Sequence, residues 1–258
     1  MPRPDKASRD WYRVVDKADS VELYIYGDIS AWPWEELGEV NAKGIVDALA
    51  AAKGKPVDLH INSGGGDVFE AFAIYTALRN HDAPVTAHVD GLAASAASLV
   101  MVAASRIVMA DVAWIMVHNP YGHAFGNAEE MRRSADLLES IAGTVRGAYS
   151  SRNPDMDWTA VMDAETWFDA HAALDAGLCD EVVGGLAAAA KVETSDMATI
   201  AGAPEAVRAM LADTAAGDAA AIIAEAEAAT DAGSDPAPGA VQERRAVLLG
   251  DRVRFIER

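Results

Sequence analysis

Apolar positions alternate between strand and helix patterns along the first part of the chain. Residues 21–30 (VELYIYGDIS) alternate apolar and polar side chains, which predicts a strand that ends in a turn. Residues 40–52 have helical spacing that stops at Gly54 and Pro56. Residues 57–63 (VDLHINS) then predict a second strand.

The same alternation continues to about residue 183. It predicts a helix within 63–80 after three glycines, a strand over 84–91, a helix through the small residues around Ser95, short strands over 106–110 and 113–117, a long amphipathic helix over 127–151, a helix over 158–164, and a helix followed by a last strand within 163–183. Strands that alternate with helices predict an α/β fold with right-handed crossovers.

The two ends of the chain differ from this pattern. Residues 1–20 are mixed and polar and predict an arm. Residues 186–240 consist mainly of Ala, Asp, Glu, Gly and Thr, a composition that cannot bury much surface. The last 15 residues (RRAVLLGDRVRFIER) regain apolar side chains among five arginines. We therefore expect a domain over 1–185 and a low-complexity linker and C-terminal tail over 186–258.

Charge and composition exclude several classes of function. The net charge of −19 argues against binding to nucleic acid or to an anionic membrane. The single cysteine, Cys179, excludes an intramolecular disulfide and fits a reducing cytoplasm. Without CxxC, HExxH or clustered histidines, neither a metal nor a cofactor is expected. The N-terminus has no apolar core of a signal peptide, and the run 93–104 is too short to span a bilayer, so we expect a cytoplasmic protein.

Three glycines, Gly64 to Gly66, follow the strand at 57–63 and precede a helix. Such a turn lets the backbone lie very near a ligand. A tight strand-to-helix connection is the structural alternative. A phosphate-binding loop is a second interpretation, but a weaker one, because the pattern matches neither GxxxxGK[ST] nor GxGxxG. A third interpretation is a loop whose backbone N–H groups donate hydrogen bonds to a ligand.

Ser95 lies in a run of small residues, DGLAASAAS, after a predicted strand. Small neighbours allow a substrate carbonyl to approach a nucleophilic hydroxyl and leave backbone N–H groups free for an oxyanion. A buried Ala/Ser-rich helix would show the same composition. Ser98, one turn further on, is a competing nucleophile.

His118 ends the strand pattern of WIMVHNP. A hydrolytic serine needs such a base, and the base needs a carboxylate that holds its tautomer. A histidine with satisfied hydrogen bonds in the core is the alternative interpretation. The glycine turn, Ser95 and His118 each lie at an element boundary, where a side chain can project into an active site.

The stretches INSGGGDVFEAFAIY, DGLAASAAS and MVHNP resemble the INSPGG, GxAAS and MIHQP blocks of the Clp protease proteolytic subunit. The resemblance covers about residues 20–185, in the same order. It implies a serine peptidase with a Clp/crotonase-like spiral of repeated β-β-α units. It also implies a homo-oligomeric ring acting on protein substrates, in which helix 127–151 is a protruding handle between two rings.

The resemblance assigns roles to individual positions. Ser95 would be the nucleophile, His118 the general base, and Gly66 and Ala96 the donors of the oxyanion hole. Gly64 stands where the family has Pro.

The third member of the triad is open between two carboxylates. Counting back from the GLCD sequence at 177–180 places Glu165 at the family's Asp position, with Asp163 two residues earlier. We favour Glu165, because one carboxylate oxygen accepting from the imidazole satisfies the role.

Further stretches, including VELYIYGDIS and ETWF, resemble Clp-like head maturation proteases of phages and prophages. That resemblance implies cleavage of scaffold or capsid proteins inside proheads in the host cytoplasm, without an ATP-driven unfoldase. The alternatives are a housekeeping Clp-type peptidase that works with an unfoldase, and a non-catalytic ring or scaffold homologue. A crotonase-type acyl-CoA enzyme is a further alternative, but the acidic core shows no Arg/Lys patch for the CoA phosphates.

Overall fold

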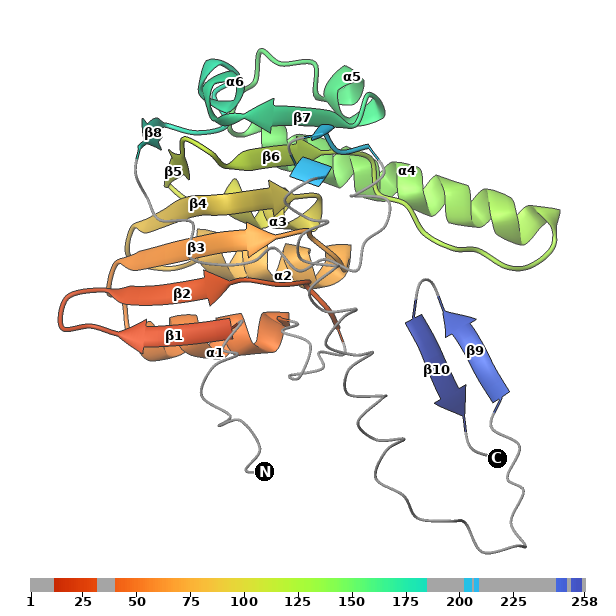
Figure 1. Cartoon of the computed structure of the whole chain (residues 1–258), viewed down its shortest axis with the longest axis horizontal. Coiled ribbons are helices and arrows are strands. Elements are labelled where there is room, and N and C mark those ends of the chain that lie inside the picture. The colour runs from red at the N-terminus through yellow and green to blue at the C-terminus, as the bar shows by residue number, and fades with distance from the viewer. Residues whose placement is uncertain are drawn as a thin grey trace, which may run out of the picture. The chain divides into compact units, whose positions relative to one another are not determined.

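The structure is a computed structural model that describes residues 12–31, 40–184, 202–205, 207–208, 245–249 and 252–256 (Figure 1). The chain forms two compact units, Met1–Ala216 and Gly217–Arg258. In the described residues, no helix is both long and apolar enough to cross a membrane.

The elements predicted between residues 21 and 183 are confirmed, with shifts of a few residues at their ends. In chain order they are β1 (Tyr12–Asp16), β2 (Val21–Ile25), α1 (Ala42–Ala52), β3 (Val57–Ser63), α2 (Val68–Arg79), β4 (Val85–Ala94), α3 (Ala96–Met101), β5 (Arg106–Ala110), β6 (Trp114–Val117), α4 (Ala128–Ser150), α5 (Trp158–Asp163), β7 (Thr166–Asp169), α6 (Ala170–Asp175) and β8 (Glu181–Val183). Two strands were not predicted. The N-terminal arm contributes β1, antiparallel to β2, and the TWFD segment forms β7, antiparallel to β6.

The sheet has the order β1-β2-β3-β4-β5-β8, and β6 joins it through β4 and pairs with β7 on its other side. Strand β4 is ten residues long and has two partners along one edge. Its residues 86–89 pair with β5, and its residues 92–94 pair with β6, both in parallel. The change of partner gives β6 a place in the sheet beside the end of β4.

The change of partner coincides with a local irregularity at Gly91. The register between β3 and β4 shifts between Ile61 and Ser63. Between these residues, the buried Asn62 side chain accepts a hydrogen bond from the Leu92 N–H at 3.1 Å. A Cβ at Gly91 would lie 2.6 Å from Asn62 Oδ1, so a residue without a side chain is needed there. Asn62 therefore fixes the second half of β4.

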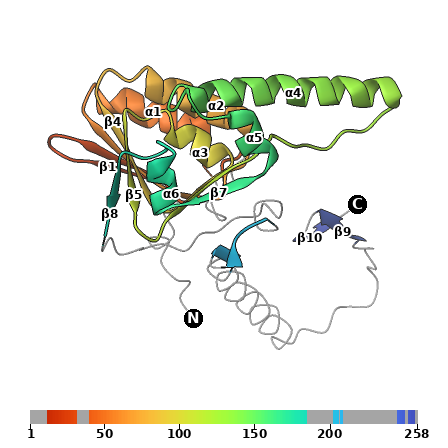
Figure 2. The same cartoon turned by 90° about the horizontal axis from the view of Figure 1, so that it is seen from above.

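Helices α1, α2 and α3 lie on one face of the sheet (Figure 2). The inward-facing strand residues alternate with half-buried ones, as in the pattern of β2, where Val21, Leu23 and Ile25 are buried. The helices bury Ile45, Ile74 and neighbouring apolar side chains against this face. The opposite face of the sheet, the open face, carries the polar residues of the alternation.

Helix α4 extends beyond the sheet (Figure 1). It begins with a capping box, in which Asn127 and Glu130 satisfy each other's backbone N–H groups. Its buried residues (Ile141, Ala142, Val145 and Tyr149) all lie in the C-terminal half. The N-terminal half is exposed, with Leu137 at 55%. This protruding helix was predicted from the sequence.

In the region after residue 185, the structure describes residues 202–205 and 207–208 in the first unit and two short strands in the second. Ala203 and Val207 are buried, with 4% and 1% of their surface exposed, and they belong to the first unit. In the second unit, β9 (Arg245–Leu249) and β10 (Arg252–Ile256) form an antiparallel pair. The apolar residues that return near the C-terminus therefore lie in two paired strands. The domain boundary at 185 itself stays a prediction.

Candidate active site

Ser95 and His118 are brought together because they follow neighbouring parallel strands. Ser95 comes directly after β4, and His118 comes directly after β6. The last pair of the ladder joins Ala94 to Met116, and the Ser95 N–H donates to the Met116 carbonyl at 3.0 Å. The carboxyl ends of parallel strands meet at one edge of a sheet, where loops converge to form sites.

The Ser95 hydroxyl lies 2.7 Å from His118 Nε2. For the hydroxyl to donate to Nε2, the proton of the neutral ring must lie on Nδ1. Both side chains are half-buried, so the pair is sheltered but reachable. This geometry is that of a serine hydroxyl and its general base.

Ser95 has a backbone conformation that side chains rarely adopt, with φ 54° and ψ −125°. Its strained turn lies between strand β4 and helix α3, as in the strand–turn–helix arrangement that exposes a nucleophilic hydroxyl. Because strain of this kind persists only where the surroundings impose it, it marks Ser95 as a functional candidate.

The glycine turn packs against Ser95 through Gly65. A Cβ at Gly65 would lie 2.7 Å from both the Ala94 carbonyl oxygen and Ser95 Cβ. The buried Ser63 hydroxyl fixes the turn, since it donates to the Gly27 carbonyl at 2.6 Å and accepts from the Gly65 N–H at 3.1 Å. Sequence reasoning assigned Gly65 no role of its own, although the three consecutive glycines predicted a close approach of the backbone.

Two backbone N–H groups are available, one in the glycine turn and one at the start of α3. The bridge between Gly66 and Ile29 uses the Gly65 carbonyl and the Asp67 N–H, so it leaves the Gly66 N–H unused. Ala96 opens α3, and the first N–H groups of a helix have no partner within it. Neither N–H has an acceptor within the part of the chain that the structure describes. Their role as an oxyanion hole stays a prediction.

Ser98, the competing nucleophile, is fully buried and engaged elsewhere. Its hydroxyl donates to the Ser95 carbonyl at 2.6 Å and lies 2.8 Å from the Tyr149 hydroxyl. Burial raises the pKa of Tyr149 to about 12, so the phenol stays neutral and offers no base to Ser98. Burial likewise raises the pKa of the Cys179 thiol to about 11, which makes it a poor nucleophile.

The register of β6 and β7 places Glu165 across from His118. Thr166 pairs with Val117 in this antiparallel ladder, so Glu165 and His118 are the next residues on each side. Glu165 leaves the strand conformation with φ 48°, and its carboxylate lies against Gly202. No hydrogen bond joins this carboxylate to the His118 ring in the structure as described, so the third role stays a prediction.

Asp163, the other candidate, is exposed and paired with Asn119. The Asn119 side-chain amide donates to Asp163 Oδ1 at 2.6 Å. Asp163 is also the last residue of helix α5, two positions before Glu165. The structure therefore gives Asp163 a partner other than the histidine.

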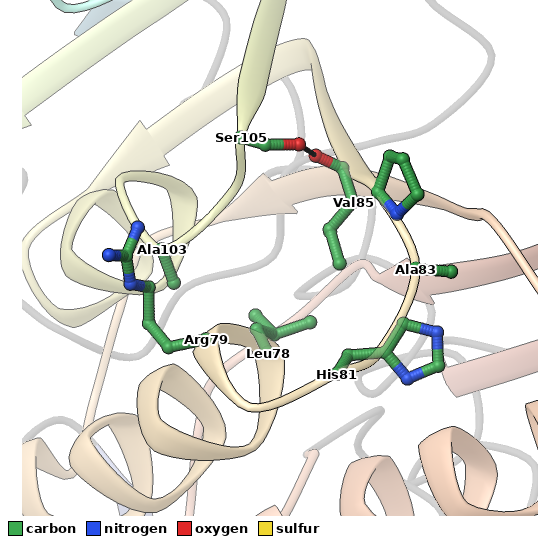
Figure 3. A pocket seen from close by; sticks show the side chains of 8 residues that line it. Leu78, Arg79, His81, Ala83, Val85, Ala103 and Ser105 are labelled. Carbon is green, nitrogen blue, oxygen red and sulfur yellow. Dashed lines mark hydrogen bonds between the residues drawn. The ribbon is translucent and has the colours of Figure 1, made fainter. Parts of the chain in front are cut away.

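A small cavity of about 100 Å³ lies between the C-terminal end of α2, the start of β4 and the end of α3 (Figure 3). Leu78 and Val85 point toward it, and the Ser105 hydroxyl on its rim donates to the Val85 carbonyl at 2.8 Å. It lies at the start of β4, whereas Ser95 follows its end. Within the described segments, no group of three His, Cys, Asp or Glu residues is arranged to hold a metal ion.

The fold and this geometry define an α/β protein with a serine–histidine pair at the carboxyl ends of two parallel strands. The sequence model of the Clp protease family matches residues 35–185. The chain belongs to the Clp protease family.

Relatives from three bacteria carry the name "ATP-dependent Clp protease proteolytic subunit". The Bacteroides fragilis protein is 30% identical over 135 residues, 50% of this chain and 65% of its own length. Subunit 1 from Protochlamydia amoebophila is 33% identical over 138 residues, 50% of this chain and 66% of its own length. Subunit 2 from Treponema denticola is 27% identical over 166 residues, 62% of this chain and 80% of its own length. The matches to the first two thus span less than two thirds of those relatives.

A solved structure confirms the predicted fold class. A ClpP1 mutant from Listeria monocytogenes superimposes with a TM-score of 0.55 at 21% identity, covering 65% of this chain and 92% of the other. At this identity the likeness concerns the mixed α/β fold alone.

Proposed function

We propose that the chain is a serine endopeptidase of the Clp proteolytic subunit type. The observation that carries the proposal is the 2.7 Å contact between Ser95 Oγ and His118 Nε2 at the strand ends. The names of the relatives support a peptidase rather than an acyl-CoA enzyme.

In the proposed reaction, Ser95 Oγ attacks the carbonyl carbon of the scissile peptide bond while its proton passes to His118 Nε2. The protonated ring then donates that proton to the leaving amine, and the C–N bond breaks. In the second half of the reaction, water attacks the acyl carbon while His118 takes its proton; the bond from that carbon to Oγ then breaks, and the ring returns the proton to Oγ. Each step uses the same two atoms, Oγ and Nε2.

The tetrahedral oxyanion would be held by the Gly66 and Ala96 N–H groups. Gly66 is exposed at the turn, and the Gly65 contact brings that turn against the start of α3. Donors of this type contribute about 3 kcal/mol each to transition-state stabilisation.

The test is labelling with a fluorophosphonate together with hydrolysis of an unstructured peptide. We expect the wild-type chain to be labelled and active, and Ser95→Ala to lose both. Ser98→Ala is the control. In the wild type the Ser98 hydroxyl is buried against Tyr149 and cannot react with the probe, so its removal should leave the labelling of Ser95 unchanged. Labelling that persists in Ser95→Ala would overturn the assignment. An unlabelled wild type would favour the non-catalytic ring protein.

The finer proposal concerns assembly and substrate. We propose a homo-oligomeric ring in which the exposed half of α4 meets a second ring, and in which scaffold or capsid proteins in proheads are the substrates. The exposed apolar residues Met131 and Leu137 on that half support an interface there. Sedimentation of the wild type and of Leu137→Asp tests it, since the charge should separate the rings.

A housekeeping peptidase that works with an unfoldase is a second candidate, favoured by the words "ATP-dependent" in the names of the relatives. The two functions differ in what they require. A head maturation protease should cleave a scaffold protein without ATP. A housekeeping subunit should degrade a folded protein only when an unfoldase and ATP are added.

A further inference from the structure

An apolar patch interrupts the polar open face of the sheet beside Ser95. Earlier in β4, this face carries His88 and Asp90. Further along the same strand, alternation places Leu92 and Ala94 on it. Across the ladders, Leu92 pairs with Trp114, and Met116 pairs with both Ala94 and Trp167. The apolar patch is thus formed by Leu92, Ala94, Trp114, Met116 and Trp167.

The described residues of the segment 202–208, which are 202–205 and 207–208, cover this apolar patch (light blue in Figure 1). Ala203 and Val207 are buried in it, while Glu205 and Arg208 are exposed. The Arg208 N–H donates to the Pro204 carbonyl at 2.9 Å, which is the hydrogen bond of one helical turn. Residues four apart lie on one side of such a turn, so Ala203 and Val207 enter the patch together.

The same segment also contacts the proposed catalytic apparatus. A Cβ at Gly202 would lie 1.6 Å from Glu165 Oε1 and 2.7 Å from its carboxyl carbon. The carboxylate expected to orient His118 therefore lies against the backbone of residue 202. The patch itself includes Ala94, the residue before Ser95, and Met116, whose carbonyl accepts the Ser95 N–H.

The covered patch retains one unsatisfied polar group. The indole Nε1–H of Trp167 is buried and has no hydrogen-bond partner within the described residues. Leaving a buried donor unpaired costs about 1–3 kcal/mol. An extended peptide, which carries a carbonyl at every residue, could supply the missing acceptor. The segment 202–208 fills the apolar surface, but within the described residues it provides no acceptor for this donor.

We propose that the apolar patch is a peptide-docking surface beside the active site, and that residues 202–208 are its intramolecular occupant and hold the enzyme in a closed state. The partner class is an apolar peptide segment with small or β-branched side chains, as Ala203 and Val207 show. This inference rests on the proposed peptidase function. A substrate gains access only in molecules whose segment has left the patch, so the apparent affinity is the intrinsic affinity multiplied by the fraction of molecules that is open.

The test uses the full chain with Val207→Asp, which places a charge in the apolar patch and expels the segment. We expect hydrogen exchange at 202–208 to increase. We also expect kcat/KM for peptide hydrolysis to rise by about fivefold or more, the lower end of ordinary coupling between sites. The matched control is Arg208→Asp, which introduces the same side chain at the exposed neighbouring position and should leave both measurements at the wild-type value.

A second variant covers the case in which Val207→Asp fails to fold. Gly202→Val places a side chain where the Glu165 carboxylate lies, at a surface position of the segment. It should also increase both exchange and activity. Glu165→Gln combined with Gly202→Val should abolish the gain in activity while exchange stays high.

Two results would overturn the proposal. One is increased exchange at 202–208 with unchanged hydrolysis, which would make the segment a structural cover only. The other is wild-type exchange as fast as that of Val207→Asp, which would mean that the segment is not docked. A chain that neither hydrolyses peptide nor takes up fluorophosphonate in any variant would instead refute the peptidase function, because hydrogen exchange would still report the docking.

Discussion

Glu165 lies across the β6–β7 ladder from His118, one step beyond the pair of Thr166 and Val117. The ladder ends at that pair, so the register brings the Glu165 backbone next to His118, and the φ of 48° at Glu165 then turns the chain out of the strand. Asp163 lies in helix α5, outside the β6–β7 pairing, and accepts a hydrogen bond from the Asn119 amide. The ladder thus favours Glu165 as the carboxylate that orients the histidine.

We therefore expect Glu165→Gln to lower kcat for peptide hydrolysis by about a thousandfold or more, because an amide can stabilise the wrong tautomer of the ring. Asp163→Asn should leave kcat within about threefold of the wild type, since its carboxylate bonds to an amide. Steady-state kinetics on both variants decides the matter. A large loss in Asp163→Asn alone would reverse the assignment.

The strained backbone of Ser95 predicts that glycine at this position makes the fold more stable but removes the nucleophile. At φ 54° a residue with a Cβ is disfavoured, whereas glycine is not. We expect Ser95→Gly to be inactive but more stable than Ser95→Ala by about 1 kcal/mol in denaturant unfolding. Equal stability of the two variants would show that the turn carries no strain.

Gly66 is predicted to be irreplaceable in the folded chain. A Cβ there would lie 2.1 Å from the Ile29 carbonyl oxygen, and its φ of 135° is unsuited to side chains. We expect Gly66→Ala to lower the free energy of unfolding by about 2 kcal/mol or more. Gly122→Ala is the matched control, since no atom lies within 4 Å of its Cβ, and it should unfold as the wild type does.

Alkaline pH should destabilise the fold through Tyr149. Its pKa is raised from 10.0 to about 12 by burial, so above pH 10 the unfolded state loses a phenolic proton that the folded state retains. Fewer protons bound to the unfolded state mean that stability falls as pH rises, by about 1.4 kcal/mol per unit between pH 10 and 12.

Urea unfolding at pH 9 to 12 measures this effect, and Tyr149→Phe is the comparison. The variant loses the contact with Ser98 and about 1 kcal/mol at neutral pH. Its stability should decline less between pH 11 and 12, where the Cys179 thiol, with a pKa of about 11, has largely titrated. Parallel declines in both proteins would exclude Tyr149 as the source.

Much of the fold could be predicted because local periodicity reports which faces of an element are buried. The helix at 128–150 and the strand at 57–63 were read from their own residues. Strands β1 and β7 were missed for the opposite reason. Each is short, and what makes it a strand is an antiparallel neighbour, β2 or β6.

The candidate site shows the same division. Ser95 and His118 were singled out by small neighbours and by element ends, and both signals lie within a few residues of each position. Their 2.7 Å contact depends on β4 having β5 and β6 as successive partners, which no stretch of sequence displays.

The sequence by itself therefore determined the order of strands and helices from 21 to 183, the protruding helix and the serine and histidine to examine, because these follow from local patterns and recognisable motifs. Only the tertiary structure decided the pairing of β4, the left-handed backbone of Ser95 and the burial of Ala203 and Val207. In an alanine-rich stretch, two apolar residues carry no periodic signal. Their burial depends on a patch built from three strands distant in the chain, and such non-local contacts form only when the fold brings those strands together.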